Sequence, residues 1–444
     1  MKDSMYHGGD SRQFERRPYV EKVYYFLGSS DLREEKRPNL TARAIDISDM
    51  GMGIETDYPL APGHMLWFNN GIGHGTGFVR WCLRQNGGYR AGVELRTVEQ
   101  TLEPHKVAED DVLAVSEEGA DYYELLDSAA EQFNSELEQL EKRCSKPYEN
   151  PGELLESTQK AFDDVLAVCQ AFEEGVADAT VIREARIAFR EKTNPILSKS
   201  YCINRTRTWP QGYQGDYKTL EVLYKNAPLS QGVGYYLDLC AMGTQLAEAV
   251  RRRIRRLEYL LRDELLKRQT PSILNIACGS CRELMGIAPE IMDSGARITC
   301  IDMDNDALAF AQDRLSYAGI LPQVELRKYN AIRMFDDETN MAEFGKQDII
   351  YSVGLFDYLP DDFLIKLLRA LYTLLNPGGK LIAAFKDADR YRSQDYHWIA
   401  DWDGFLQRTG KDFLAILSEA DVPSSRISEA REETGIIVFY TATK

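Results

Sequence analysis

Short stretches of β-branched and aromatic residues alternate with turn-rich pieces along the first hundred residues, and no helical period lies between them. Pieces such as Asn69-Asn70-Gly71 mark the turns. This spacing predicts a small antiparallel β-barrel over residues 1–100. The predicted strands cover residues 20–27, 40–47, 53–56, 64–68, 77–83 and 89–95.

From residue 118 the apolar positions recur at steps of three and four, so the period becomes helical. Tyr122 and Phe133 belong to an apolar stripe whose opposite face is mostly Glu, Asp and Gln. Similar stripes predict a second helix after Pro151 and a third at 180–191. We therefore expect residues 101–200 to be an acidic helical segment that couples its neighbours, and its long amphipathic helices also suit a homodimer.

The remaining chain divides at Pro271. Residues 201–270 predict a loop rich in glycine and aromatics (201–217) and a long helix from 235 to 268. From Pro271 strands and helices alternate, which predicts a doubly wound α/β sheet over 271–444 with antiparallel strands at its end. The predicted strands are 272–277, 298–301, 324–328, 348–352, 380–385, 425–428 and 435–440, and the helices between them are 283–292, 307–317 and 361–375.

Charge and composition narrow the class of partner. The 444 residues carry a net charge of −17, of which −13 falls in 101–200, whereas 201–270 is positive by 5. Because a nucleic acid polymer needs a broad basic face, we expect none as a partner. The positive stretch and the neutral barrel instead suit small anionic ligands.

The chain has no apolar run of membrane-spanning length and no apolar stretch near its start, so we expect a cytoplasmic protein without a transmembrane segment. Its eight cysteines have no regular spacing, which favours reduced thiols. Cys278 and Cys281 form a Cys-x-x-Cys pair, but no second pair and no nearby His pair completes a zinc site. We therefore expect no metal.

Two groups of residues in the predicted barrel carry ligand chemistry. Arg12 and Arg16, followed by Arg17, form an Arg-x-x-x-Arg motif before the first strand, and Asp46, Ser48 and Gly51 form an Asp-x-Ser-x-x-Gly motif after the second. Guanidinium groups hold phosphates and stack on purines, and a carboxylate accepts hydrogen bonds from a guanine edge. The list of candidate ligand residues is Arg12, Arg16, Arg17, Asp46, Ser48 and Gly51.

Together the two motifs resemble the PilZ domain, a bacterial receptor of the second messenger cyclic di-GMP. The resemblance covers residues 10–98. It implies that the arginines hold the phosphates and guanine faces of cyclic di-GMP, that Asp46 and Ser48 bind a guanine edge, and that Gly51 shapes the loop.

A second site is predicted after residue 271. Ser272 to Glu283 read as a strand, a turn of small residues and a helix start, which lets a cofactor approach backbone amides. The strand at 298–301 ends in Asp302, a carboxylate where α/β proteins bind ribose hydroxyls. A dinucleotide site would keep Gly-x-Gly-x-x-Gly, but only Gly279 is present.

Residues 272–440 resemble class I S-adenosylmethionine (SAM)-dependent methyltransferases, although Asn275, Ala277 and Cys281 depart from the general pattern. A narrower family is closer. The run Cys278-Gly279-Ser280-Cys281-Arg282-Glu283 is similar to the turn of bacterial enzymes that make 3-hydroxypalmitic acid methyl ester, with Ser for Pro. Further matching blocks are at 212–217, 251–255, 354–359, 401–402 and 408–409, so this resemblance covers 195–440.

The resemblance implies SAM as cofactor and a carboxylate as methyl acceptor. One arginine of the helix at 251–256 is expected to orient that carboxylate, and Arg251 is our candidate. The other catalytic candidates are Tyr213, Asp216, Tyr217 and Tyr358. The cofactor-binding candidates are Ala277, Cys278, Gly279, Asp302, Met303, Asn330, Ala331, Val353 and Gly354.

Our hypothesis is a SAM-dependent O-methyltransferase that acts on a hydroxy fatty acid or a related lipid-like small carboxylate and is regulated by cyclic di-GMP. The alternatives are a cyclic di-GMP-responsive adaptor whose methyltransferase fold is degenerate, and a methyltransferase that acts on a protein or another metabolite. The departures at 275–281 are the feature that favours the adaptor.

Overall fold

The computed structural model describes residues 17–27, 40–48, 51–58, 60, 65–68, 76–85, 88–96, 117–146, 148–176 and 178–444. The chain forms two compact units. One comprises residues 1–106 with 210–213, and the other comprises 107–209 with 214–444. Arg12 and Arg16 lie outside the described residues.

The first unit is a closed barrel in the order β1-β2-β3-β6-β5-β4. Every neighbouring pair is antiparallel, so the predicted antiparallel strands are confirmed. Alternate residues point inward, and Ala44, Met52, Ile54 and Leu66 are among those in the core. The strands are β1 (Arg17–Leu27), β2 (Leu40–Ser48), β3 (Gly51–Thr56), β4 (Met65–Phe68), β5 (Thr76–Gln85) and β6 (Gly88–Arg96).

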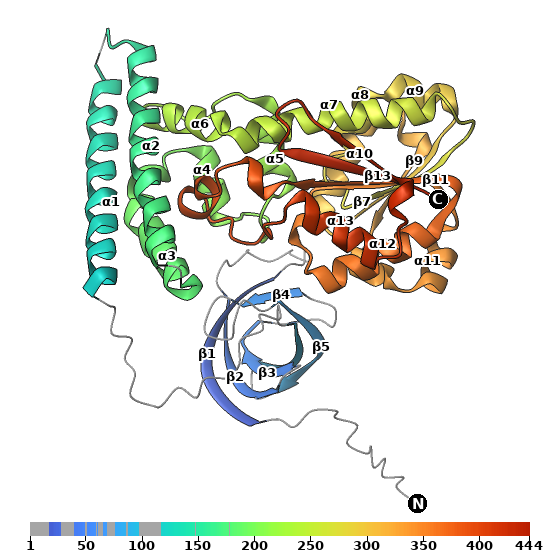
Figure 1. The fold of residues 1–444 in the computed structure, drawn as a ribbon, viewed down its shortest axis with the longest axis horizontal. Helices are drawn as coiled ribbons and strands as arrows, with labels where there is room; N and C mark the ends of the chain where they lie inside the picture. Colours follow the sequence, from blue (N-terminus) through green and yellow to red (C-terminus); the bar gives the residue numbers. More distant parts are fainter. Residues whose placement is uncertain are drawn as a thin grey trace, which may run out of the picture. The chain divides into compact units, whose positions relative to one another are not determined.

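Three helices begin the second unit: α1 (Glu117–Cys144), α2 (Pro151–Val176) and α3 (Ala179–Leu197). Figure 1 shows α1 and α2 side by side. Their apolar stripes meet in one core, where the rings of Phe133 and Phe162 pack edge to face at 5.3 Å. Helices are thus present at 117–197 within the predicted segment, whose residues 101–116 lie outside the described ones, and the acidic residues of these helices lie mostly on the opposite, exposed faces.

Four helices lie within residues 201–265, and here two sequence predictions are wrong. The predicted loop at 201–217 contains α4 (Tyr201–Thr208), and the predicted single helix at 235–268 is two helices, α6 (Val233–Gly243) and α7 (Gln245–Leu265). Thr244 breaks them with an extended ψ of 150°, and its hydroxyl hydrogen-bonds the carbonyl of Ala241 and the hydroxyl of Tyr396. Helix α5 (Tyr217–Lys225) precedes them.

The rest of this unit is a seven-stranded sheet in the order β12-β13-β11-β10-β7-β8-β9. β11, β10, β7, β8 and β9 are parallel, whereas β13 is antiparallel to both its neighbours, as predicted for the chain end. The strands are β7 (Ser272–Ile276), β8 (Arg297–Asp302), β9 (Val324–Lys328), β10 (Gln347–Val353), β11 (Leu375–Lys386), β12 (Ile427–Arg431) and β13 (Ile437–Thr443).

Helices cover both faces of this sheet (Figure 1). On β7, Ile273 packs with α7 and α8, whereas Leu274 packs with α12 and α13, as the alternation of a strand requires. The helices are α8 (Arg282–Gly286), α9 (Ala288–Ser294), α10 (Asn305–Tyr317), α11 (Asp337–Phe344), α12 (Asp361–Leu374) and α13 (Gly410–Glu419). Short 3-10 turns lie at Leu321–Gln323, Ala331–Phe335, Phe356–Tyr358, Ala388–Arg390 and Ser424–Arg426, and a π-helix lies at Asp395–Ile399.

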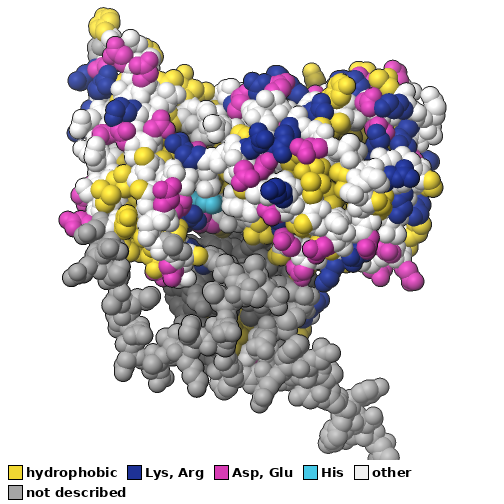
Figure 2. All heavy atoms as spheres, viewed as in Figure 1, with side chains coloured by type: hydrophobic (Ala, Val, Ile, Leu, Met, Phe, Trp, Pro, Cys, Tyr) yellow, Lys and Arg dark blue, Asp and Glu magenta, His cyan; other side chains and the backbone are white. Residues whose placement is uncertain are grey.

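Two further properties of the described residues concern membrane-spanning helices and surface charge. Among the described residues, no helix combines the length and the apolar character that crossing a bilayer would require. On the face drawn in Figure 2, basic and acidic side chains of the described residues are interspersed.

Candidate functional site

The turn after β7 is the centre of the predicted cofactor site. Ala277, Gly279 and Cys281 have φ values of +55°, +53° and +48°, so the chain coils sharply between the strand and α8. Both Ala277 and Cys281 adopt a conformation that favours glycine. This strain lies at the end of β7, where the strand order reverses between β7 and β10, and such a position is typical of a ligand site.

Asp302 holds this turn against β8. One carboxylate oxygen accepts the Gly279 N–H at 2.8 Å, and the other accepts the Asp304 N–H at 2.9 Å. Burial raises the pKa of Asp302 to about 6, and the carboxylate is still ionised at neutral pH. The carboxylate keeps a lone pair for a further donor such as a ribose hydroxyl.

A pocket of about 60 Å³ opens beside the turn. Ala277, Cys278 and Gly279 line it together with Val353 at the end of β10 and Tyr217 at the start of α5. Peptide groups and small side chains at the carboxyl ends of parallel strands fit the polar part of a nucleoside cofactor.

The other predicted cofactor residues follow neighbouring strands. Met303 follows Asp302 in the chain, and Asn330 follows β9 and accepts the Ile332 N–H, with the buried Ala331 between them. Gly354 follows β10 with φ of +110°. All lie at the edge of the sheet that carries the turn, as expected for a parallel arrangement.

A larger cavity of about 290 Å³ lies next to this pocket. Residues of α2, α4, α5, α6 and α7 and of the chain between 392 and 405 line its walls, and Leu220 and Arg253 line both spaces. The walls are mainly apolar and aromatic: Phe162, Cys202, Ile203, Leu223, Leu246, Ala247, Val250, Tyr396, Ile399, Trp402 and Phe405. Such a cavity suits an apolar ligand with one polar end.

Arg253 supplies a charged group in the cavity wall that can contact the polar end of such a ligand. Its side chain is buried, and one guanidinium nitrogen donates to the Tyr224 hydroxyl at 3.1 Å. Its Nε has no hydrogen-bond partner, and no carboxylate among the described residues lies within 4.0 Å of the guanidinium. The Asp357 carboxylate interacts with Arg253 only at longer range, so an anion that reached the guanidinium would gain a direct ion pair.

The other arginines of α7 have different surroundings. Arg251 donates to Glu248 and to the carbonyl of Met242, and Arg252 pairs with Glu248 and Glu433. Neither lines the cavity. Arg256 lies over the ring of Tyr259 at 5.3 Å.

A second cation, Lys386 of β11, also lines the cavity, but Asp357 accepts a hydrogen bond from its ammonium at 2.5 Å. Burial lowers the pKa of Lys386. Arg392, which also lines the cavity, pairs with Asp163 at 3.1 Å and with Asp395 at 2.9 Å. Arg253 is therefore the cation of the described wall whose charge is not balanced by such a pair.

The four aromatic and acidic catalytic candidates lie in different surroundings. Tyr358 lines the cavity, where its hydroxyl accepts from Trp402 at 2.8 Å, and burial raises its pKa. Tyr217 lines the small pocket. Asp216 caps α5 through the Lys218 and Thr219 N–H groups and pairs with Arg205, and Tyr213 belongs to the segment 210–213 of the other compact unit.

Sequence reasoning missed the support behind the turn. Glu221 of α5 is buried and accepts from Ser280 at 2.7 Å, Arg282 at 2.9 Å and Arg314 at 2.7 Å. It therefore ties α5 to the α8 end of the turn and to α10. No local motif marks it, because its partners come from residues 59 to 93 positions away.

In the barrel the second motif lies at the β2–β3 hairpin. Ser48 pairs with Gly51 and its hydroxyl donates to the Gly51 carbonyl at 3.3 Å, while Asp46 lies 3.6 Å from Arg90. Arg17 is the first residue of β1, and its partner in the strand register is Ile47. The hairpin thus holds the described residues of the motif on adjacent strands.

Comparison with known proteins identifies the sheet-bearing segment. Residues 274–381 match the family model described as a methyltransferase domain. This segment is therefore similar to methyltransferase domains. Among curated proteins, an uncharacterised protein of Haemophilus influenzae is 26% identical over 115 residues. That match covers 26% of this chain and 42% of the relative, so the chain spans less than half the length of the curated relative it matches.

Three solved structures of low sequence identity are among those that resemble parts of this chain. A protein of Bordetella parapertussis described as a possible exported protein is 16% identical and covers 72% of this chain and 96% of its own, with a TM-score of 0.43. Magnesium protoporphyrin IX methyltransferase of Synechocystis with bound SAM is 13% identical, and the match covers 45% of this chain and 84% of the methyltransferase, with a TM-score of 0.33. An O-methyltransferase family protein of Burkholderia thailandensis is 15% identical, and the match covers 47% of this chain and 62% of that protein, with a TM-score of 0.33. At these TM-scores the likeness carries no functional argument.

Proposed function

We propose that the chain is a SAM-dependent O-methyltransferase that methylates the carboxylate of a hydroxy fatty acid or a related small molecule. The observation that carries the proposal is the buried guanidinium of Arg253, which lacks a carboxylate partner in the described chain and lines both the small pocket and the apolar cavity. An acceptor with an anionic head and an apolar tail matches both features.

SAM supplies a methyl group on a sulfonium. A carboxylate is ionised at neutral pH, so the chain needs no strong base to activate it. Arg253 binds and orients the carboxylate, and the apolar walls exclude water from the reacting oxygen. Catalysis at such a site is mainly positioning.

Glu283 bears on the rival proposal of a degenerate adaptor. Asn275 replaces an acidic residue of the general pattern, but its side-chain amide donates to the buried carboxyl of Glu283 at 2.9 Å. Tyr351 donates to the same oxygen at 2.8 Å. The carboxyl group of Glu283 in α8 therefore lies against Asn275 of β7, although burial raises its pKa to about 7, and its presence there weakens the support for the adaptor.

Two carboxylates compete for Arg253 in this proposal, because SAM carries one of its own. If the acceptor binds there, removal of the guanidinium weakens the binding of the acceptor and leaves the affinity for SAM unchanged. If the cofactor carboxylate binds there, the affinity for SAM falls instead. The two outcomes separate the sources of the anion.

The experiment that tests the acceptor class is incubation of the purified full chain with a cell lysate and SAM labelled on its methyl group. The proposal predicts label in the organic-extractable lipid fraction, released by mild base as expected for a methyl ester. Label in protein or in a water-soluble metabolite would favour a different acceptor, and no label with intact SAM binding would favour the adaptor.

The regulatory half of the proposal is that cyclic di-GMP binds the barrel. A strip of backbone without side chains at Gly53 and Gly92 supports this proposal. Gly53 pairs with Asp46 of β2 on one side and with Gly92 of β6 on the other. A Cβ at Gly53 would lie 2.9 Å from the Asp46 carboxylate oxygens, and Trp81 lies over Gly92. A carboxylate and an indole beside a flat backbone strip suit a guanine base.

A further inference from the structure

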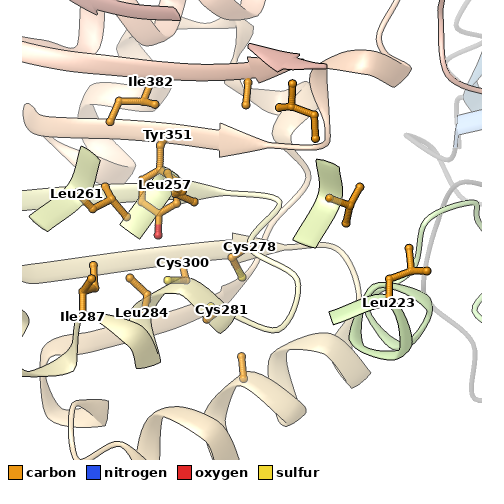
Figure 3. Packing of buried hydrophobic residues seen from close by; sticks show 14 of the residues in the cluster. Leu223, Leu257, Leu261, Cys278, Cys281, Leu284, Ile287, Cys300, Tyr351 and Ile382 are labelled. Atoms are coloured by element: carbon orange, nitrogen blue, oxygen red, sulfur yellow. The ribbon is translucent and has the colours of Figure 1, made fainter. Parts of the chain in front are cut away.

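Three thiols meet behind the cofactor turn. The Sγ atoms of Cys278, Cys281 and Cys300 all lie within 4.8 Å of one another. Figure 3 shows the three sulfurs close together between the turn and β8. Cys281 and Cys300 are fully buried, and Cys278 is 8% exposed because it lines the small pocket.

The fold, not the sequence spacing, assembles this cluster. β7 and β8 are parallel with Asn275 opposite Cys300, and the Cys278 N–H donates to the carbonyl of Ile301 at 3.0 Å. The Cys281 N–H donates to the carbonyl of Cys278 at 3.0 Å, which closes the turn and returns the second thiol to the first. The third ligand that the sequence prediction lacked therefore comes from the neighbouring strand.

We propose that Cys278, Cys281 and Cys300 bind a thiophilic metal ion, for which Zn²⁺ is the probe. Three thiolates at the usual Zn–S distance of about 2.3 Å lie about 3.8 Å apart in a tetrahedral site. The sulfurs need to approach one another by no more than about 1 Å. Soft thiolate ligands select zinc or copper(I) over magnesium or calcium.

Charge and access favour a cation here. The carboxyl group of Asp302 interacts electrostatically with Cys281 and that of Glu283 with Cys300, and negative charge at these positions attracts a cation. Binding forms three metal–sulfur bonds and releases the three thiol protons to solvent. The fourth coordination position faces the small pocket that Cys278 lines, where a water molecule completes the site.

The bound ion joins the cofactor turn to the end of β8. It holds Cys278 and Cys281 on either side of Gly279, the residue that donates to Asp302. Metal loading therefore raises the thermal midpoint of the full chain, and it fixes the turn before SAM binds.

The test uses the full chain, reduced with a metal-free phosphine and stripped by chelator. One equivalent of Zn²⁺ binds in a calorimetric titration, and Co²⁺ in its place gives the intense near-ultraviolet thiolate-to-cobalt absorption. Cys281→Ser and Cys300→Ser lose this absorption and most of the affinity. Cys144→Ser, which removes a half-buried thiol of α1, leaves both unchanged.

Two results overturn the proposal: no uptake of either ion by the reduced wild type, or uptake that Cys281→Ser and Cys300→Ser leave intact. If a variant fails to fold, the wild-type cobalt spectrum still decides, because weak absorption without charge-transfer bands excludes thiolate ligands. Neither readout depends on methyl transfer, so the result stands apart from the proposed function.

Discussion

Arg253 is the residue whose replacement separates the proposed acceptor from the alternatives. Arg253→Met should lower kcat/KM for a hydroxy fatty acid by roughly ten- to a hundredfold, because a hydrogen bond to a charged group contributes about 1.5–3 kcal/mol. The measurement is steady-state methylation, with calorimetry to show that the affinity for SAM is unchanged.

Arg252→Met is the matched control for this change. Arg252 lies on the same helix, is 37% exposed at its side chain and pairs with Glu248 and Glu433 away from the cavity. We expect its kinetics to equal those of the wild type. Equal losses in both variants would show that α7 tolerates no such change, and a loss of SAM affinity in Arg253→Met alone would assign the guanidinium to the cofactor.

Asp302 is the second residue with a decisive variant. Asp302→Asn keeps the size of the side chain but removes the charge that accepts from Gly279 and Asp304. The Kd for SAM should rise at least tenfold, since charge-assisted hydrogen bonds are lost. Calorimetry on this variant and on Asp313→Ala, an exposed residue of α10, measures the difference; an unchanged Kd in Asp302→Asn would remove Asp302 from the cofactor site.

The π-helix Asp395–Ile399 is the element that packs against α2 and α3. Trp398 is fully buried, its ring meets Phe172 and Phe189 edge to face at 5.9 and 5.5 Å, and its Nε1 donates to Glu173 at 2.8 Å. Trp398→Ala should reduce the free energy of unfolding by about 3–5 kcal/mol through the cavity it leaves.

Urea unfolding of the full chain, followed by far-ultraviolet circular dichroism, measures this loss. Tyr317→Ala is the control, because Tyr317 is 90% exposed and exposed positions change the free energy of unfolding by about 0.5 kcal/mol or less. A Trp398→Ala midpoint equal to that of Tyr317→Ala would show that the π-helix does not stabilise the bundle.

Helices and strands were predictable from the sequence where the apolar residues recur at a regular period. The strands of the barrel and of the sheet follow from alternation and from turn residues between them, and α10 and α12 follow from their stripes. The break at Thr244 was missed because a contact with Tyr396, 152 positions later, stabilises it. Helices α11 and α13 were missed as well, and short helices give only a short period.

The candidate site was predictable only in part, for a related reason. Gly279 and Asp302 were visible because a turn and a strand end carry local signals. Arg253 was not distinguishable from Arg251 by spacing, since only the direction of each side chain on α7 decides which one lines the cavity. Cys300 joins Cys278 and Cys281 through strand register, which no motif encodes.

For the whole molecule, the proposal links cyclic di-GMP at the barrel to methyl transfer. Asp46→Ala should weaken cyclic di-GMP binding roughly ten- to a hundredfold, because it removes a charged acceptor, whereas Glu55→Ala on the exposed side of β3 should not. Regulation further requires that the ligand favour one state of the chain over another. Turnover of the wild type should therefore change with cyclic di-GMP and turnover of Asp46→Ala should not; binding without any change in turnover or SAM affinity would contradict the link.

The central claim is methyl transfer to a carboxylate. The most direct measurement incubates the purified full chain with methyl-labelled SAM and a 3-hydroxy fatty acid, with the corresponding fatty alcohol as the matched acceptor. The account predicts a labelled product that mild base hydrolyses, formed from the acid alone and much reduced in Arg253→Met. Label on the alcohol, or a base-stable product from the acid, would contradict it.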